Sequence, residues 1–148
     1  MSTLERAIAI ALEAHTGQHE KNGAPYLLHP LRVMLGVQTS GALLEDARMV
    51  AVLHDVVEDN PAWTLERLRG EGFSEAVITG VDAVTRRTTE SYTEFVARAG
   101  RHSLGRAVKL ADLRDNMDIT RLAEVGEKER ERLARYLAAY RLLTEPSP

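Results

Sequence analysis

The sequence predicts an all-α protein, and three features of it carry that prediction. Apolar residues recur at spacings of three and four along most of the chain, which is the period of a helix with one buried face. Sustained strand-like alternation of apolar and polar residues does not occur in the sequence. Helix-breaking residues gather in a few short zones. We therefore expect a single-domain helical bundle over residues 1–148, a length that can bury a core without disulfides.

In the first half of the chain, Ser2 or Thr3 can cap a first helix that ends near His15. Glycines and a proline then predict a loop over residues 16–29. Further helices are expected over residues 31–40 and 43–58, the second of them ended by Asn60-Pro61. Residues 47–57 are apolar on almost all sides, which predicts a helix that is buried on several faces.

In the second half, short helices are expected to begin at residues 64 and 74, the latter reaching about residue 85. Longer helices are expected over residues 92–99, 103–122 and 126–143. Arg86-Arg87 are expected to stabilise a helix C-terminus through its dipole. The alternating charges between Glu127 and Arg135 predict a solvated helix face.

Composition narrows the class of protein. Hydrophobic residues make up 44% and charged residues 28%, which is typical of a globular domain. The absence of cysteine excludes disulfides, thiolate zinc sites and cysteine nucleophiles. The N-terminal residues lack a secretory signal pattern and no segment has membrane-spanning length, so a cytoplasmic protein without a membrane partner is expected. A formal net charge of -3 disfavours a nucleic-acid partner.

The most informative segment runs from His54 to Asp59 and places four ionisable side chains at the end of a helix of core residues. His54 and Asp55 are followed one helical turn later by Glu58 and Asp59. Burying an unpaired charge is costly, and carboxylates are tolerated there when they are paired or bind a cation. This segment therefore favours a metal site over a solvated acidic helix end.

Two further segments supply candidate ligands. Asp112 interrupts an apolar stripe and shares one helix face with Lys109 and Asn116, while His29 precedes Pro30 at the start of a helix. Two imidazoles and two carboxylates suit Mn²⁺, Fe²⁺ or Zn²⁺, which activate water and neutralise charge on a phosphoryl oxygen.

Each of these residues also has a structural alternative. Asp112 can pair with Lys109 or Arg114, His29 can form a hydrogen bond with the backbone, and Asn116 can stabilise its helix. The three remaining histidines are interpreted as structural or surface residues: His15, His19 and His102.

The order His29, His54-Asp55, Asp112 resembles the HD superfamily of metal-dependent phosphohydrolases. Within that superfamily, three segments resemble the hydrolase domain of RelA/SpoT-type alarmone enzymes: residues 17–30, residues 54–59, and residues 109–112 with 116–117. The resemblance spans roughly residues 10–120. It implies an HD-type helical bundle.

The resemblance also implies an activity, which is the Mn²⁺-dependent removal of the 3′-pyrophosphate from guanosine tetra- or pentaphosphate by a stand-alone hydrolase. Other divalent transition metals suit the same ligands. By position, the metal ligands would be His29, His54, Asp55 and Asp112. Glu58 and Asp59 match an acidic pair that positions or activates the attacking water. Lys21 and Asn116 match positions near the nucleotide, and Lys109 is a candidate cationic contact to it.

Three departures from the family pattern concern substrate recognition. Glu20 stands where alarmone hydrolases usually have an arginine that can stack on the base. Asp115 replaces a histidine, and Asp118-Ile119 replace Arg-Thr. The guanine preference is therefore open, and an adenine alarmone or another phosphorylated nucleotide fits the same metal chemistry. A non-catalytic nucleotide-binding HD domain is the alternative from a different class.

Overall fold

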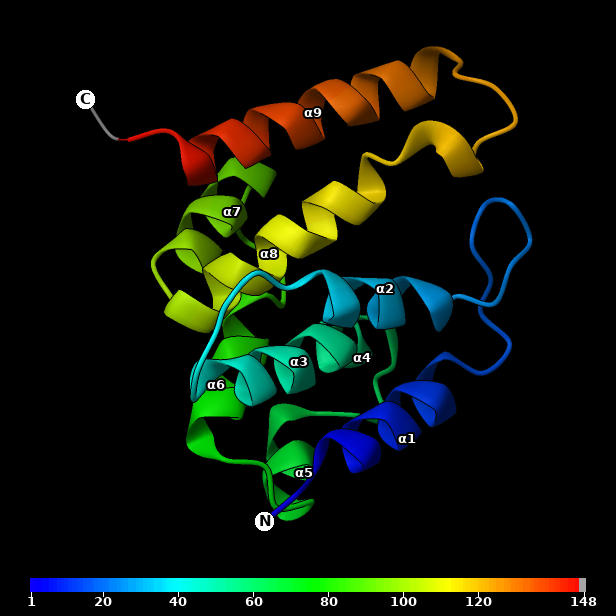
Figure 1. Ribbon diagram of the computed structural model, residues 1–148. Coiled ribbons are helices and arrows are strands. Elements are labelled where there is room, and N and C mark those ends of the chain that lie inside the picture. Colours follow the sequence, from blue (N-terminus) through cyan, green and yellow to red (C-terminus); the bar gives the residue numbers. More distant parts are fainter. Residues whose placement is uncertain (147–148) are drawn as a thin grey trace.

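The computed structural model describes residues 1–146, and it confirms the all-α prediction (Figure 1). Within these residues no β-strand forms, and the nearest approach to one is an isolated antiparallel bridge between His19 and Pro25. None of the helices in this range combines the length with the apolar character that crossing a membrane requires.

The helices are arranged with α3 near the middle of the molecule and with α1 and α9 toward opposite ends (Figure 1). Their bounds are α1 Leu4–His15, α2 Leu28–Gly36, α3 Leu43–Leu53, α4 Val56–Asp59, α5 Leu65–Gly70, α6 Glu75–Ala83, α7 Tyr92–Gly100, α8 Ser103–Asn116, the short 3₁₀ helix η1 Ile119–Arg121, and α9 Glu127–Thr144.

Short polar side chains begin several of these helices. Of the two residues predicted to cap α1, Thr3 is the one whose side chain accepts a hydrogen bond from the backbone, at Arg6. Thr64 and Ser74 do the same for α5 and α6. Ser91 and Glu94 form a reciprocal capping box at the start of α7. These local bonds satisfy amides that would otherwise have no partner in the first turn.

The main core is built around α3, which packs against α1, α2, α6 and α8. Its residues from Val50 to Leu53 are fully buried, as the all-round apolar pattern predicts. Because the helix is enclosed, the residues directly after Leu53 lie in the interior of the protein. The residues that follow are His54 and Asp55.

A second, smaller cluster joins α9 to α7 and α8. Its buried members are Val96, Leu113, Ala139 and Leu143. Tyr92 and Tyr136 pack against its edge. Through this cluster α9 is held beside the C-terminal half of α8 (Figure 1).

The helix expected over residues 31–40 lies earlier in the chain, at Leu28–Gly36, so His29 belongs to it and not to the predicted loop. Two further predicted helix ranges are wrong, and both errors lie next to the candidate site. The helix expected over residues 43–58 is divided into α3 and α4, because His54 and Asp55 form the turn between them. The helix expected over residues 103–122 ends at Asn116, and the separate 3₁₀ helix η1 follows. The side chain of Asp118 caps η1 by accepting a hydrogen bond from the backbone N–H of Thr120. In both places a polar side chain competes with the helical backbone for hydrogen bonds.

Candidate metal centre

The structure brings together the four side chains that the sequence proposed as metal ligands. His29 lies in α2, His54 and Asp55 in the turn between α3 and α4, and Asp112 in α8. The ligand atoms of His29, His54 and Asp55 all lie within 4.8 Å of one another. Oδ1 of Asp112 lies 3.0 Å from Nε2 of His29 and 3.4 Å from Nε2 of His54. Two imidazoles and two carboxylates thus converge on one point.

Each histidine has one ring nitrogen bound by the protein. Nδ1 of His54 is 2.6 Å from the carbonyl oxygen of Ala51, and Nδ1 of His29 is 2.6 Å from Oδ2 of Asp115. Because a carbonyl or carboxylate oxygen accepts, each Nδ1 carries the hydrogen and donates it. Nε2 is then the nitrogen that faces the carboxylates in both rings, which is the arrangement that second-shell partners impose on metal-binding histidines.

The fit of a cation can be tested on His54, which is 3% exposed. Its Nε2 lies 3.1 Å from Oδ2 of Asp55, yet it makes no contact of hydrogen-bond geometry within residues 1–146. A buried nitrogen without a hydrogen-bond partner is costly unless something else binds it. A divalent cation between the imidazoles and the carboxylates would satisfy it, so the donor set fits a transition metal.

Charges at the centre shift one another's pKa values. Burial disfavours a charged His54, but the carboxylates of Asp55 and Asp112 outweigh burial and hold the pKa of His54 well above its ordinary value. Burial likewise opposes ionisation of Asp112, but Lys109 and the two imidazoles outweigh it and hold the pKa of Asp112 well below its usual range. The carboxylates are therefore ionised and attract positive charge.

Three further side chains hold the carboxylates in place. The hydroxyl of Tyr26 donates a hydrogen bond to Oδ2 of Asp55. Nζ of Lys109 lies 2.8 Å from Oδ2 of Asp112, and Nδ2 of Asn116 donates to Oδ1 of Asp112 at 3.0 Å. The pairing of Lys109 with Asp112, which the sequence offered as an alternative to ligation, therefore coexists with an Asp112 oxygen that faces the histidines.

The two acids of the predicted pair lie in different surroundings. Glu58 lines a cleft of about 450 Å³ together with Asp55 and Asp112, and its Oε1 accepts a hydrogen bond from the backbone of Arg86 at 2.9 Å. Partial desolvation raises the pKa of Glu58. Asp59 is absent from the described lining of this cleft, and its Oδ2 accepts a hydrogen bond from Gln18 at 2.9 Å.

The same cleft has cationic and aromatic walls. Lys109, Arg86 and Arg135 line it, and so do Tyr92 and Phe95. The guanidinium carbons of Arg86 and Arg135 lie 5.9 Å and 5.4 Å from the centre of the Tyr92 ring. The predicted role of Arg86-Arg87 at a helix C-terminus is wrong, because α6 ends at Ala83 and has no basic residue in its last turn. Arg135 belongs to the charge run that was expected to face solvent.

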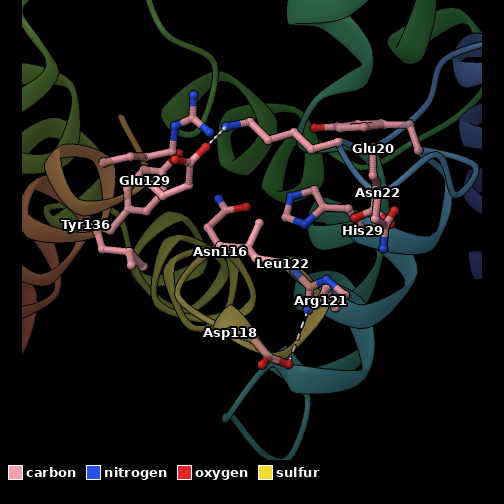
Figure 2. Close-up of a pocket in the computed structure, with 13 residues that line it drawn as sticks. Glu20, Asn22, His29, Asn116, Asp118, Arg121, Leu122, Glu129 and Tyr136 are labelled. Carbon is pink, nitrogen blue, oxygen red and sulfur yellow. Dashed lines mark hydrogen bonds and ion pairs between the residues drawn. The ribbon is translucent and has the colours of Figure 1, made fainter. Parts of the chain in front are cut away.

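A second cavity, of about 230 Å³, adjoins the first and shares Tyr26, His29, Asn116 and Tyr136 with it. Figure 2 shows Glu129 and Tyr136 on one side, Glu20 and Asn22 on the other, and Asn116 between them. Lys21 lines this cavity and reaches across it to Glu129, with Nζ 3.7 Å from Oε1. A loop near the N-terminus and helix α9 therefore enclose a space that opens beside the metal centre.

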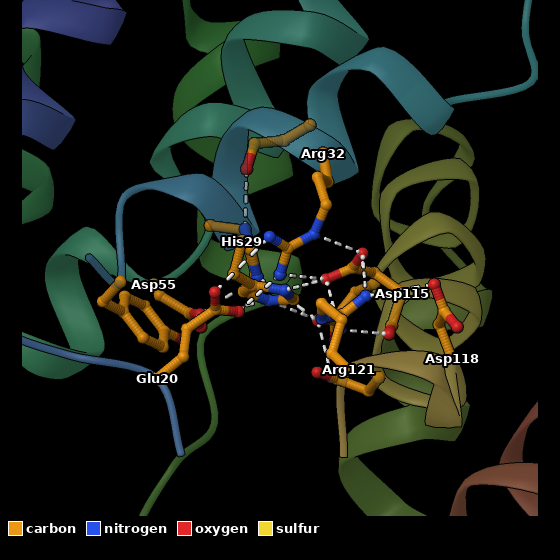
Figure 3. Close-up of polar contacts among 12 residues, drawn as sticks. Glu20, His29, Arg32, Asp55, Asp115, Asp118 and Arg121 are labelled. Carbon is orange, nitrogen blue, oxygen red and sulfur yellow. Dashed lines mark hydrogen bonds and ion pairs between the residues drawn. The ribbon is translucent and has the colours of Figure 1, made fainter. Parts of the chain in front are cut away.

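Sequence reasoning missed several of the residues that shape this region. Tyr26, Tyr92, Arg32 and Arg135 were given no role at the site. Arg32 forms ion pairs with both Glu20 and Asp115, and Asp115 also contacts Arg121 (Figure 3). The acids at positions 20 and 115, which depart from the family pattern, are therefore paired with arginines inside the protein. No local signal marks these pairs, because their partners come from other segments.

The all-helical fold, with a cluster of imidazoles and carboxylates that could hold a metal ion, is of the kind that the sequence order predicted. A family model described as "HD domain" matches residues 7–114, and the chain belongs to this family.

Among proteins to which the chain is similar is a guanosine-3′,5′-bis(diphosphate) 3′-pyrophosphohydrolase of Haemophilus influenzae, 34% identical over 137 residues, covering 85% of this chain and 20% of the relative. The bifunctional (p)ppGpp synthase/hydrolase SpoT of Escherichia coli is 30% identical over 141 residues, covering 89% and 20%. A GTP pyrophosphokinase of Streptomyces coelicolor is 32% identical over 138 residues, covering 86% and 16%. The chain thus spans a fifth or less of the length of these relatives.

Proposed function

We propose that this chain is a metal-dependent phosphohydrolase that removes the 3′-pyrophosphate from a nucleotide, with guanosine 3′,5′-bis(diphosphate) as the first candidate substrate. The observation that carries the proposal is the convergence of His29, His54, Asp55 and Asp112, all of which except His54 line a cleft with cationic walls. Membership of the HD domain family and similarity to proteins named as 3′-pyrophosphohydrolases support it.

The proposed cofactor is Mn²⁺, held by the two Nε2 atoms and by the carboxylates of Asp55 and Asp112, although another divalent transition metal suits the same ligands. When bound, such an ion makes water a stronger nucleophile at neutral pH and offsets negative charge on a phosphoryl oxygen. The ring nitrogens at Nδ1 are already engaged, so Nε2 needs no rearrangement to bind.

In the proposed reaction the oxygen of a water molecule bonds to the phosphorus nearest the ribose, and the bond from that phosphorus to the 3′-oxygen breaks. Pyrophosphate leaves, and the 3′-oxygen takes a proton to become a hydroxyl. Glu58 is proposed to accept the proton of the attacking water, because its carboxylate lines the cleft and its raised pKa favours proton acceptance. The Asp59 carboxylate, bound to Gln18, is proposed to support this end of α4.

Phosphate groups are proposed to lie against the cationic wall of the larger cleft. Arg86 and Arg135 are exposed there, whereas Lys109 is buried and shares its charge with Asp112. Guanidinium groups suit phosphate because they donate in a planar fork. Asn116 and Lys21 line the adjoining cavity, which is the proposed place for the nucleoside.

Position 20 bears on the base preference of the site. Glu20 stands where an arginine was expected, and Arg32 pairs with it and with Asp115. The Arg32 guanidinium is thus already engaged by two carboxylates. Arg32 is therefore not expected to stack on the base in place of the arginine that Glu20 replaces. An adenine alarmone or another phosphorylated nucleotide remains the alternative substrate.

A second candidate function is nucleotide binding without catalysis. Several similar proteins are named GTP pyrophosphokinase, a name for a synthetic activity and not for a hydrolytic one. Similarity by itself therefore does not assign hydrolysis. Glu58 favours catalysis, because a domain that merely binds a nucleotide has no need of a proton acceptor beside the metal ligands. The cytoplasm is the proposed location of the protein.

The test is a substrate panel with the purified 148-residue chain. Guanosine and adenosine 3′-pyrophosphates and nucleotide monophosphates are incubated with Mn²⁺ or Zn²⁺, and release of pyrophosphate and phosphate is measured. We expect pyrophosphate release with Mn²⁺, abolished in His54→Ala and in Asp112→Ala. His102→Asn, which changes a histidine at the start of α8 outside the two cavities, is the matched control and should retain activity. A Mn²⁺-loaded protein that leaves the whole panel intact would refute the enzymatic proposal.

A further inference from the structure

Asp115 has an unusual set of contacts for a residue outside the proposed ligand set. Its side chain is 10% exposed, and Oδ2 lies 2.6 Å from Nδ1 of His29. Arg32 donates to both of its oxygens, from Nε at 2.8 Å and from Nη2 at 3.2 Å. Arg121 also contacts both oxygens, at 3.3 Å and 3.4 Å, and donates to the Asp115 carbonyl oxygen at 2.8 Å. One carboxylate thus accepts from one imidazole and two guanidiniums.

The network extends from the metal centre to the loop that encloses the smaller cavity. Arg32 contacts Glu20 as well as Asp115, and Arg121 contacts Asp118 at 3.3 Å (Figure 3). In Figure 3 the Arg32 side chain extends from α2 toward the carboxylate of Asp115 on α8. Arginines and carboxylates alternate along this chain of contacts, so each charge has a partner of opposite sign.

An ionised carboxylate is suited to this position because it offers several lone-pair directions and no hydrogen to donate. It can accept from His29 and from both arginines at the same time. A histidine here, which the family resemblance led us to expect, has at most one free acceptor nitrogen. The acid at position 115 and the arginines at positions 32 and 121 therefore form one matched set in this chain.

We propose that Asp115 is a positioning residue that fixes the ring of His29 with Nε2 toward the metal, and that Arg32 and Arg121 hold Asp115 in place for this task. The inference rests on the proposed metal centre and adds a residue to it. It also explains the departure at position 115, because a carboxylate that is engaged on three sides is not free to contact the nucleotide.

The experiment measures metal affinity and the hydrogen bond separately. Mn²⁺ binding to the 148-residue chain is followed by titration calorimetry and by the electron paramagnetic resonance signal of free Mn²⁺. In the metal-free protein, the Nδ1 proton of His29 is observed by ¹H–¹⁵N NMR and assigned through its loss in His29→Gln.

Asp115→Asn keeps the shape but leaves a single acceptor oxygen for three donors. We expect it to raise the Kd for Mn²⁺ by about 10- to 100-fold and to weaken or remove the Nδ1 proton signal. Arg32→Gln, which leaves the contact between Asp115 and His29 possible, should give a smaller increase in Kd. Asp46→Asn removes the same charge in the first turn of α3, outside both cavities and outside the contacts of Asp115, and should leave the Kd within about twofold.

The outcomes are distinguishable. An unchanged Kd and an unchanged Nδ1 signal in Asp115→Asn, with the variant folded by circular dichroism, would overturn the positioning role. If that variant does not fold, Arg32→Gln decides, since a wild-type Kd and Nδ1 signal there would refute the proposed clamp. A wild-type protein that binds Mn²⁺ but hydrolyses no substrate would contradict the proposed reaction alone. A wild-type protein that binds no Mn²⁺ would overturn both.

Discussion

At the scale of single residues, the site depends on side chains that hold other side chains. Tyr26 donates to Asp55, Lys109 and Asn116 bind Asp112, and the Ala51 carbonyl oxygen accepts from His54. These bonds leave a limited set of atoms facing the centre. Pre-orientation of this kind lowers the cost of assembling a metal site, because the ligands need little reordering on binding.

Glu58 offers the clearest test of a residue that acts on the reaction and not on the metal. Glu58→Gln preserves an acceptor oxygen for the Arg86 backbone but cannot take a proton. Loss of a general base typically slows turnover by about 10²- to 10⁴-fold, so we expect kcat to fall in that range. Mn²⁺ affinity, measured by calorimetry, should stay within about twofold of the wild type. Loss of bound metal in this variant would show that Glu58 is a ligand instead.

At the scale of elements, the connection between α6 and α7 is held by one ion pair with several backbone contacts. Arg98 donates to the carbonyl oxygens of Asp82 and Thr85 and pairs with Glu90 at 2.6 Å. The hydrogen bond from Arg98 lowers the pKa of Glu90 from 4.5 to about 2. This segment contains Arg86, so the pair helps to place one wall of the cleft.

That pKa shift gives a pH dependence of known sign. Because the pKa of Glu90 is lower in the folded protein, its ionised form stabilises the fold above pH 4.5, and this contribution is lost as the pH falls toward 2. Glu90→Gln should lower the free energy of unfolding at pH 7 by roughly 1–3 kcal/mol. Urea denaturation at several pH values checks this. The gap between wild type and variant should narrow below pH 4.5, and a gap that is constant down to pH 3 would contradict the assignment.

Close packing of α8 against α6 and α7 depends on Gly105. A Cβ atom there would lie 2.9 Å from Cβ of Ala83 and 3.0 Å from the carbonyl oxygen of Ala99, neither of which is the end of a flexible side chain. Overpacking costs typically 1–3 kcal/mol, partly offset by the better helix propensity of alanine, so Gly105→Ala should destabilise by about 1–2 kcal/mol.

The matched control for this substitution is Gly70→Ala at the end of α5, where nothing lies within 4 Å of the added atom. Its free energy of unfolding should change by less than about 0.5 kcal/mol. Chemical denaturation of both variants measures the difference. Equal stabilities would show that the contact between α8 and its neighbours adapts to the extra methyl group.

At the scale of the whole molecule, the metal centre joins segments that lie far apart in the sequence. Its proposed ligands come from α2, from the turn after α3 and from α8, while α9 and the loop before α2 contribute to the adjoining cavity. An ion at this point would link three of the helices that form the main core. Binding to the folded state alone should therefore stabilise the entire fold.

We expect Mn²⁺ at about 100 times its Kd to stabilise the protein by about 2.7 kcal/mol, which corresponds to a rise in Tm of roughly 5–10 °C for a chain of this size. Differential scanning calorimetry with Mn²⁺ and with EDTA measures it. Mg²⁺ prefers ligand sets of oxygen alone and should raise the Tm less. Asp112→Ala is the control, and a Tm that responds to Mn²⁺ equally in this variant would place the ion elsewhere.

The all-α class, the caps at Thr64 and Ser74, a cap at Ser2 or Thr3, and the segments that carry the proposed ligands could all be predicted from the sequence. These features are local, because helical periodicity and capping involve residues within a few positions of one another. The fully buried stretch of α3 could be predicted in the same way. His54 and Asp55 were marked as unusual because they follow that stretch directly.

The tertiary structure alone decided which side chains meet. Asp115 reaches His29 across 86 residues of sequence, Glu58 and Asp59 turn to different partners, and Arg135 on α9 joins the wall of a cleft begun by α4. The break between α3 and α4 belongs here too, since the turn is formed where His54 binds the carbonyl oxygen of Ala51. Such contacts depend on how helices pack against one another. Residues that packing brings together are far apart in the sequence, so no local pattern predicts that they will meet.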